Sequence, residues 1–255
     1  VKEADPATPV TVSADPLPTV QINGVVWAQV VVGNTVYVGG EFTQARPAGA
    51  AAGTNETPRT NLLAYNITTG ELISSWAPTP NGAVYSLAAS PDGSRIYVGG
   101  AFTNVNGQTR NRIAALSPTN GSVIAGFAPN ATARVYGISA TDTRVYMAGW
   151  FTVVNGVTRN KFAAVRPSDG ALLSWAPDAQ DGQGRAILLS PDGSKVALGG
   201  SFTTLNGSSN PGYGLALVDS DTGASLPTPA NSVIRNAGPN AAVLSLATDG
   251  GNSFW

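Results

Sequence analysis

The 255-residue sequence predicts an all-β fold of the β-propeller class, and three observations lead to that prediction. A segment of about 50 residues recurs with four strand-like stretches in each copy, which is the sequence signature of propeller blades. Turn residues such as Asn-Gly and Thr-Gly return at the same places in successive copies. No part of the repeat shows a sustained apolar period of about 3.6 residues, which an amphipathic helix requires.

The clearest copy of the repeat is the segment 83–103, AVYSLAASPDGSRIYVGGAFT. It predicts a strand, a tight Ser-Pro-Asp-Gly turn and a second strand that ends in Gly-Gly-x-Phe-Thr. Related segments occupy residues 26–43, 135–152 and 186–203, and a shorter one begins at Ala242. The phenylalanines that mark the four longer copies are spaced by 60, 49 and 51 residues. The longest interval contains a loop insertion at 46–58, RPAGAAAGTNETP.

The second unit shows which stretches of a repeat we expect to be strands. They are Val84–Ala89, Arg95–Phe102, Arg112–Ser117 and Ser122–Phe127. The connection between the second and third stretches contains Asn106-Gly107, a strong signal for a tight hairpin turn. The same Asn-Gly pair recurs in the third and fourth units.

The repeats divide the chain into an extended Pro-rich segment at 1–21 and a β-propeller at 22–255. We predict four complete four-stranded blades, at about 22–80, 81–130, 131–178 and 183–229, and the start of a fifth at 241–255. Trp255 falls inside a predicted strand of the fifth blade. The sequence therefore favours part of a larger ring of about seven blades, completed by a C-terminal remainder or by another chain. The alternative is a closed ring of four blades whose last strand supplements the first blade.

Residues that recur at fixed places are expected in the core, because each blade buries both faces against its neighbours. The paired glycines at the end of the second strand allow a neighbouring backbone or ring to approach closely. The recurrent aromatic residues are expected to fill the space between blades rather than to bind a ligand. This predicted core comprises Gly39, Gly40, Phe42, Trp76, Gly99, Gly100, Phe102, Phe127, Gly149, Phe151, Trp175, Gly199, Gly200 and Phe202.

The composition argues against several classes of function. The net charge is −1, and Lys and Arg do not cluster as a nucleic-acid binding surface requires. No apolar stretch approaches the roughly 18–20 residues that span a bilayer, so we expect no membrane insertion. The chain has no Cys and no His, which removes disulfides, thiol catalysis, Cys/His zinc sites and triads built on His.

The first 18 residues, VKEADPATPVTVSADPLP, are rich in Pro, Ala and Thr and are typical of the mature start of an exported protein. The sequence begins at Val1 and shows no basic region followed by an apolar leader. We therefore expect a secreted protein, extracellular or at the cell surface, from which a signal peptide has been removed.

The segment Tyr97–Pro129, YVGGAFTNVNGQTRNRIAALSPTNGSVIAGFAP, resembles the delta-60 repeat (DUF5122-type), a family of β-propeller repeats of secreted bacterial proteins. The similarity recurs through residues 26–229. In particular, the chain is similar to propellers at the N-terminus of large actinobacterial surface or exported proteins. Ala148-Gly149 replaces the usual Gly-Gly, and Asn210-Pro211-Gly212 replaces Thr-Arg-Asn. These departures leave the predicted fold unchanged, and the resemblance implies no particular activity.

An arginine recurs in the connection between the second and third strands of each of the first three units, with an asparagine beside or near it. A guanidinium presents a planar fork of donors that suits carboxylates or sugar hydroxyls. Because the arginine recurs, the sequence favours the alternative that each one caps its own loop by donating to backbone carbonyls. The candidate ligand-binding residues of this kind are Arg59, Arg110, Arg159, Asn111 and Asn160.

Two pairs of acidic residues are further candidates. Asp178 and Asp181, in the loop WAPDAQDGQGR, form the best local carboxylate pair for ligand binding or glycoside cleavage. Asp219 and Asp221 lie in a turn that could contribute oxygen ligands to calcium, although the full spacing of a calcium loop is missing. We expect no resident cofactor, with calcium at Asp219 and Asp221 as the alternative.

The similarity of the units, without a non-repeated catalytic cluster, predicts a non-catalytic binding or scaffold module with a glycan or protein ligand. One alternative is a propeller enzyme whose site needs residues beyond Trp255: a glycan-acting hydrolase or lyase, or a quinoprotein-type oxidoreductase. Only fold analogy supports that alternative, and fold does not determine function. Another alternative is a structural subunit whose unfinished blade is completed by a partner chain through strand addition.

Overall fold

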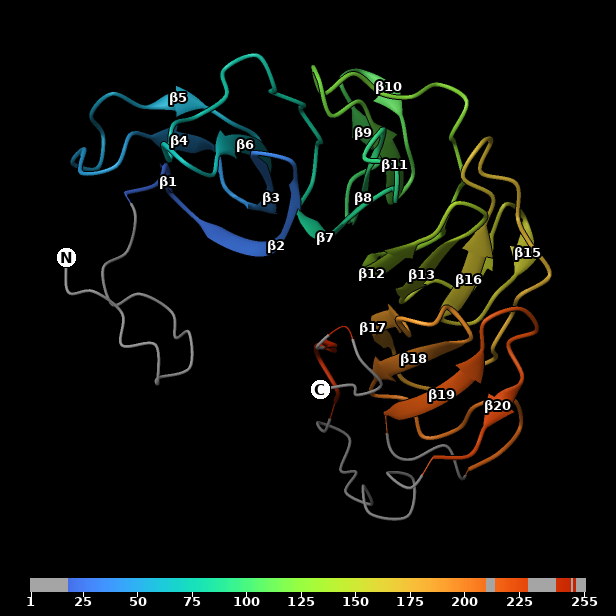
Figure 1. Cartoon of the computed structure of the whole chain (residues 1–255). Coiled ribbons are helices and arrows are strands. Elements are labelled where there is room, and N and C mark those ends of the chain that lie inside the picture. The colour runs from blue at the N-terminus through green and yellow to red at the C-terminus, as the bar shows by residue number, and fades with distance from the viewer. Residues whose placement is uncertain (1–17, 210–213, 229–241, 249, 251–255) are drawn as a thin grey trace, which may run out of the picture.

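The computed structural model describes residues 18–209, 214–228, 242–248 and 250. Within these residues the secondary structure consists of strands and turns, and no helix long and apolar enough to cross a membrane is found. Four antiparallel sheets follow one another along the chain and are arranged in an arc, as blades of a β-propeller (Figure 1). The predicted all-β propeller fold is confirmed.

Each sheet is a meander of consecutive strands that begins on the concave side of the arc. Blade 1 contains β2 (Val25–Val32), β3 (Thr35–Glu41) and β6 (Leu62–Asn66), and blade 2 contains β7 (Val84–Ala89), β8 (Ile96–Gly100) and β11 (Ile113–Leu116). Blade 3 contains β12 (Val135–Ala140), β13 (Val145–Gly149) and β16 (Phe162–Val165). Blade 4 contains β17 (Gly184–Leu189), β18 (Lys195–Gly200), β19 (Leu215–Asp219) and β20 (Ser225–Leu226).

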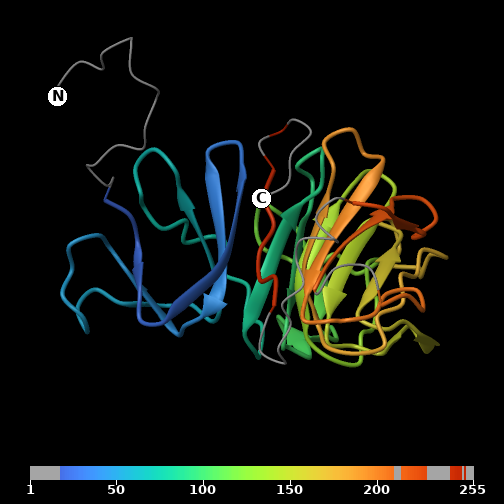
Figure 2. The same ribbon diagram turned by 90° about the horizontal axis from the view of Figure 1, so that it is seen from below.

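The four inner strands β2, β7, β12 and β17 lie next to one another and line the concave side (Figures 1 and 2). The register between each inner strand and its neighbour is interrupted once by a β-bulge, and the bulge falls at the same place in every blade. A bulged strand presents one residue outside the ladder of paired residues. The inner surface of the propeller therefore displays one such residue from each blade.

The outermost predicted strand is shorter than expected in three blades. In blades 1 to 3 the fourth stretch pairs through one bridge only: Tyr65 with Leu72, Leu116 with Val123, and Val165 with Leu172. The chain turns soon after each bridge, and in blade 1 the Trp76 N–H donates to the Ile73 carbonyl at 3.2 Å. This turn sends the large ring at position 76 toward the next blade, where the indole Nε1 donates to the Ser117 carbonyl at 2.9 Å.

Small hairpins close the connections between the second and third strands. They comprise β9 (Asn104–Val105) with β10 (Gln108–Thr109), and β14 (Val153–Val154) with β15 (Val157–Thr158). In the first hairpin Asn106 and Gly107 have φ angles of 53° and 77°, as the predicted tight turn requires. Blade 1 carries the predicted insertion here instead, with β1 (Gln21–Ile22), β4 (Gln44–Arg46) and β5 (Thr57–Pro58) in a separate small sheet.

The core consists of clusters between successive blades, and the aromatic residues predicted for it are all buried. The predicted glycines give the inner strand of the next blade room to approach. A Cβ added at Gly39 would lie 2.6 Å from Val84 Cγ1, and one at Gly99 would lie 2.7 Å from Val135 Cγ1. A side chain at either position would push the neighbouring blade away.

The described residues near the two ends of the chain extend this pattern. Of the predicted N-terminal segment, the Val20 N–H donates to the Gly70 carbonyl at 2.9 Å, and β1 pairs with β4. At the other end, residues 242–248 lie against blade 4, where the Val243 N–H donates to the Gly200 carbonyl at 2.9 Å. Residues 242–248 form no assigned strand, and the fifth blade expected at 241–255 stays a prediction. Residues 1–17 and the predicted strand that contains Trp255 lie outside the described residues.

Candidate functional site: an aromatic and arginine-lined cavity at the propeller axis

The residue that each bulge leaves unpaired differs from blade to blade. It is Trp27 in β2, Tyr85 in β7, Tyr136 in β12 and Arg185 in β17, because the register skips that residue in each ladder. Leu244 follows Val243 as Tyr85 follows Val84, so it holds the same position in the fifth copy. The repeat thus brings five side chains of four kinds to equivalent positions on the concave side.

These five residues and Arg134, one residue before β12, line a cavity of about 380 Å³. Its volume lies within the range of ordinary small-ligand sites. The Trp27 and Tyr85 rings are 6.3 Å apart between centroids with their planes inclined at 63°, and the Tyr85 and Tyr136 rings are 5.2 Å apart. The guanidinium carbon of Arg185 lies 4.2 Å from the Tyr136 ring centroid, within cation–π distance. We call this group of six residues the axial cavity.

The axial cavity combines exposed ring surface with positive charge. Trp27 is 54% exposed and Leu244 is 69% exposed, whereas aromatic residues of the interblade core are almost wholly buried. A hydrogen bond with Tyr136 is the largest influence that raises the pKa of Arg134, with a smaller contribution from Glu41. Arginine supplies the positive charge of this cavity, since a guanidinium is not deprotonated in proteins.

The residues that recur from unit to unit do not predict this cavity, because they mark the packing between blades. The axial position is variable instead: it reads Trp, Tyr, Tyr, Arg and Leu in successive copies. A useful signal was nevertheless present. Strand residues that vary between repeats while their neighbours stay constant are candidates for ligand contacts, since the constant ones maintain the packing.

The recurrent arginines predicted as ligand groups lie in the outer loops and are directed at backbone carbonyls. In each arginine, Nη1 donates to the backbone carbonyl of the preceding residue, and Nη2 donates to the carbonyl of a residue 14 or 15 positions later. The donor–acceptor distances are 2.7–3.3 Å. The Arg59 and Arg110 side chains are also buried, at 6% and 9% exposure. The acceptors are Pro58 and Ser74 for Arg59, Thr109 and Ala125 for Arg110, and Thr158 and Leu173 for Arg159.

Arg159 also lines a smaller cavity of about 180 Å³, together with the predicted residues Asn160 and Asp178. The Asn160 amide donates to the Asp178 carboxylate at 2.7 Å. Asp181 makes different contacts: its carboxylate accepts the backbone N–H groups of Thr203 and Thr204. Burial alone would raise the pKa of Asp181, but hydrogen bonds with these threonines hold it below the usual value. Asn111 belongs to blade 2, where its carbonyl accepts the Ala131 N–H.

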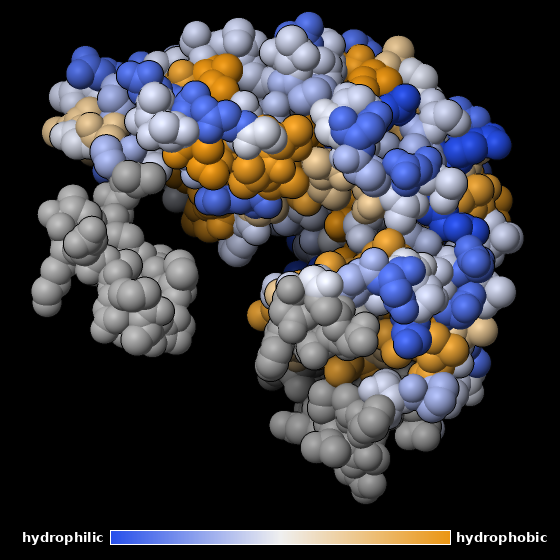
Figure 3. Space-filling model, viewed as in Figure 1, coloured by the Kyte–Doolittle hydropathy of each residue, from blue (hydrophilic) through white to orange (hydrophobic). Residues whose placement is uncertain are grey.

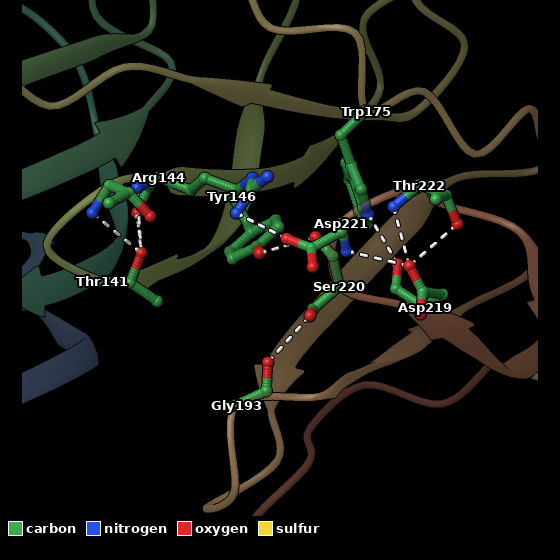
Figure 4. A network of polar contacts seen from close by, with 10 residues as sticks. Thr141, Arg144, Tyr146, Trp175, Gly193, Asp219, Ser220, Asp221 and Thr222 are labelled. Carbon is green, nitrogen blue, oxygen red and sulfur yellow. Dashed lines mark hydrogen bonds and ion pairs between the residues drawn. The ribbon is translucent and has the colours of Figure 1, made fainter.

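The predicted calcium residues take part in a network between blades 3 and 4 (Figure 4). The Asp219 carboxylate accepts the N–H groups of Asp221 and Thr222 within its own turn. Asp221 instead forms an ion pair with Arg144 of blade 3 at 2.9 Å. Among the residues that the structure describes, no group of three or more acidic side chains is positioned to hold a metal ion.

These observations define the class of the protein: a β-propeller of repeated blades with a ligand-sized cavity at its axis. Residues 91–127 match the profile of a family described as a domain of unknown function (DUF5122) β-propeller. The chain is thus a β-propeller, and its residues 91–127 match the DUF5122 type, in agreement with the resemblance to the delta-60 repeat.

Solved structures support the fold at low sequence identity. The Cps50 (Swd1) β-propeller domain of Myceliophteria thermophila is 11% identical with a TM-score of 0.55, and the match covers 90% of this chain and 61% of that one. Hydrazine synthase of Kuenenia stuttgartiensis is 13% identical with a TM-score of 0.53, covering 86% of this chain and 52% of that one. The present chain thus spans little more than half the length of these structures. No curated protein matches the sequence.

Proposed function

We propose that the protein is a secreted or cell-surface binding module that holds a saccharide in the axial cavity. The observation that supports this most is the exposure of ring surface at equivalent positions of the inner strands, with Trp27 54% exposed. Tyr and Trp present a flat apolar face and a polar edge. A sugar ring matches this surface, because its C–H faces can pack on the rings while its hydroxyls reach polar neighbours.

A pair of matched variants tests the proposal. Trp27 lines the cavity, whereas Trp150, which is 48% exposed, does not. On an array of neutral and acidic oligosaccharides, Trp27→Ala should weaken the binding of any captured glycan by about tenfold or more, and Trp150→Ala should leave it unchanged. Absence of glycan binding by the unaltered protein, or an equal loss in both variants, would contradict the proposal.

We further propose a scaffold role in which the open face of blade 1 receives another propeller blade. Val84 and Val135 are fully buried against the preceding blade, but Val26, at the equivalent place in β2, is 38% exposed. Val25 and Val31 of the same strand are 47% and 51% exposed. Figure 3 shows hydrophobic surface on this part of the molecule. A blade that carries the Gly-Gly-x-Phe-Thr sequence would fit, whether it comes from the same polypeptide or from another chain.

A further inference from the structure

The two arginines of the axial cavity differ from the other arginines that the structure describes. Every other one donates to a backbone carbonyl or a carboxylate: Arg46, Arg59, Arg95, Arg110, Arg112, Arg144, Arg159 and Arg166. Among the described residues, the partner found for Arg134 is the Tyr136 hydroxyl, and the partner found for Arg185 is the face of the Tyr136 ring. Most of their donor groups therefore remain available to a ligand.

The availability of these donors is meaningful because both arginines face the same small volume. The two ion pairs found among the described residues, Arg144 with Asp221 and Arg166 with Asp169, lie outside the axial cavity. Glu41 influences Arg134 only weakly. Among the described residues, no acidic side chain lines the cavity, so these residues give it a positive local charge although the chain as a whole carries −1.

The chemistry of the lining identifies the complementary group. A guanidinium binds a carboxylate through parallel N–H···O bonds, which are stronger than bonds between neutral groups. Tyr85 and Tyr136 supply the adjoining ring faces, and the Arg185 guanidinium lies over the ring of Tyr136. The axial cavity thus offers ring faces for stacking beside guanidinium N–H donors that can bind one anionic group.

We propose that the axial cavity binds an acidic saccharide, with the sugar ring on the tyrosines and its carboxylate on Arg134 and Arg185. This inference rests on the proposed function and narrows it to a ligand class. The rings provide affinity for any sugar of suitable shape, and the arginines select the uronic acids among them. Removing the charge of either partner should therefore weaken binding without abolishing the stacking contribution.

The test compares tetragalacturonate with its fully methyl-esterified form, which keeps the sugar and loses the charge. By isothermal titration, the unaltered protein should bind the acid at least about tenfold more tightly than the ester. Arg185→Gln should reduce that preference several-fold, because Arg134 alone then binds the carboxylate, while leaving affinity for the ester within about twofold. Arg166→Gln, which removes a charge from an exposed pair outside the cavity, should preserve the preference.

The possible outcomes separate the two levels of the proposal. Equal affinity for acid and ester would contradict the proposed preference for acidic saccharides, but it would remain consistent with a saccharide site in the axial cavity. Binding of neither, together with no capture on the glycan array, would overturn the site itself. Equally tight binding of hexaglutamate would show that charge suffices and would overturn the saccharide assignment. If Arg185→Gln unfolds the protein, Arg185→Lys replaces it, and a reduced acid preference is again expected because Lys lacks the planar fork.

Discussion

Equivalent tyrosines in three blades differ in the hydrogen bonds that their hydroxyls make. This difference allows the contribution of one hydroxyl to stability to be predicted. The Tyr37 and Tyr146 hydroxyls donate across the interface to carbonyls of Pro118 and Ser220 at 2.8 and 2.9 Å. The Tyr97 hydroxyl is buried without a partner among the described residues. The acceptor expected for Tyr97, the Pro167 carbonyl, receives a guanidinium N–H from Arg95 instead.

We therefore predict opposite effects of one substitution at two equivalent positions. Tyr146→Phe should lower the free energy of unfolding by about 1 kcal/mol, since it removes a buried hydrogen bond. Tyr97→Phe should be neutral or stabilising, because it removes a buried polar group that has no partner. Urea denaturation of the two variants beside the unaltered protein provides the measurement. A loss of stability at position 97 as large as that at 146 would refute this interpretation.

At the scale of elements, the asparagine of the Asn-Gly hairpin has a second role that local sequence does not reveal. Asn106 Oδ1 accepts the Thr79 N–H from the preceding connection, and its Nδ2 donates to the Gly121 carbonyl. Asn155 and Asn206 repeat both contacts in the next two blades. Blade 1 lacks this hairpin. There the Val20 N–H donates to the carbonyl of Gly70, which is equivalent to Gly121. The asparagine of each hairpin thus connects the hairpin to two other loops through side-chain hydrogen bonds.

Two substitutions at position 106 distinguish the contribution of the turn conformation from that of the two side-chain hydrogen bonds of Asn106. Asn106→Gly keeps the positive φ and loses the two side-chain bonds, so it should cost about 1–3 kcal/mol of unfolding free energy. Asn106→Ala should cost about 1 kcal/mol more, because alanine is also strained at a φ of 53°. Chemical denaturation measures both, and an Asn106→Gly variant as stable as the unaltered protein would show that the side-chain contacts contribute nothing.

The Ser-Pro-Asp-Gly turns give the protein a dependence on acid. The Ser90 hydroxyl is the main cause that lowers the pKa of Asp92 to about 2, and Ser190 does the same for Asp192. A lowered pKa in the folded state means stability that is present above about pH 4 and is lost as the pH falls toward 2. The double variant Asp92→Asn, Asp192→Asn should show a shallower decline between pH 4 and 2 in thermal melts. An unchanged pH profile would contradict this.

The sequence determined much of the fold because each unit repeats its local signals. The inner strand Val84–Ala89 was predicted to the residue, and the Asn106-Gly107 turn was located correctly. The short fourth strands were overestimated, since their length depends on where the chain turns toward the next blade. The axial cavity could not be predicted from local pattern. Its five equivalent residues lie 49–59 positions apart, and only the curvature of the arc and the position of each bulge bring them together.

At the scale of the whole molecule, the exposed face of β2 leads to a prediction about the native assembly. If another blade covers Val26, amide hydrogen exchange over residues 25–32 should be about as slow in the native assembly as over 84–89 of β7. In the isolated 255-residue chain, exchange over 25–32 should be clearly faster. Fast exchange of β2 in both preparations would show that this face is free in the native protein.

The position of the bound ligand would test the axial cavity most directly. We would determine a crystal structure of the protein soaked with tetragalacturonate. We expect sugar density against Tyr85 and Tyr136, with a carboxylate within hydrogen-bonding distance of Arg134 and Arg185. Density only in the outer cavity of Arg159, Asn160 and Asp178, or an empty axis at saturating ligand, would contradict the proposed site.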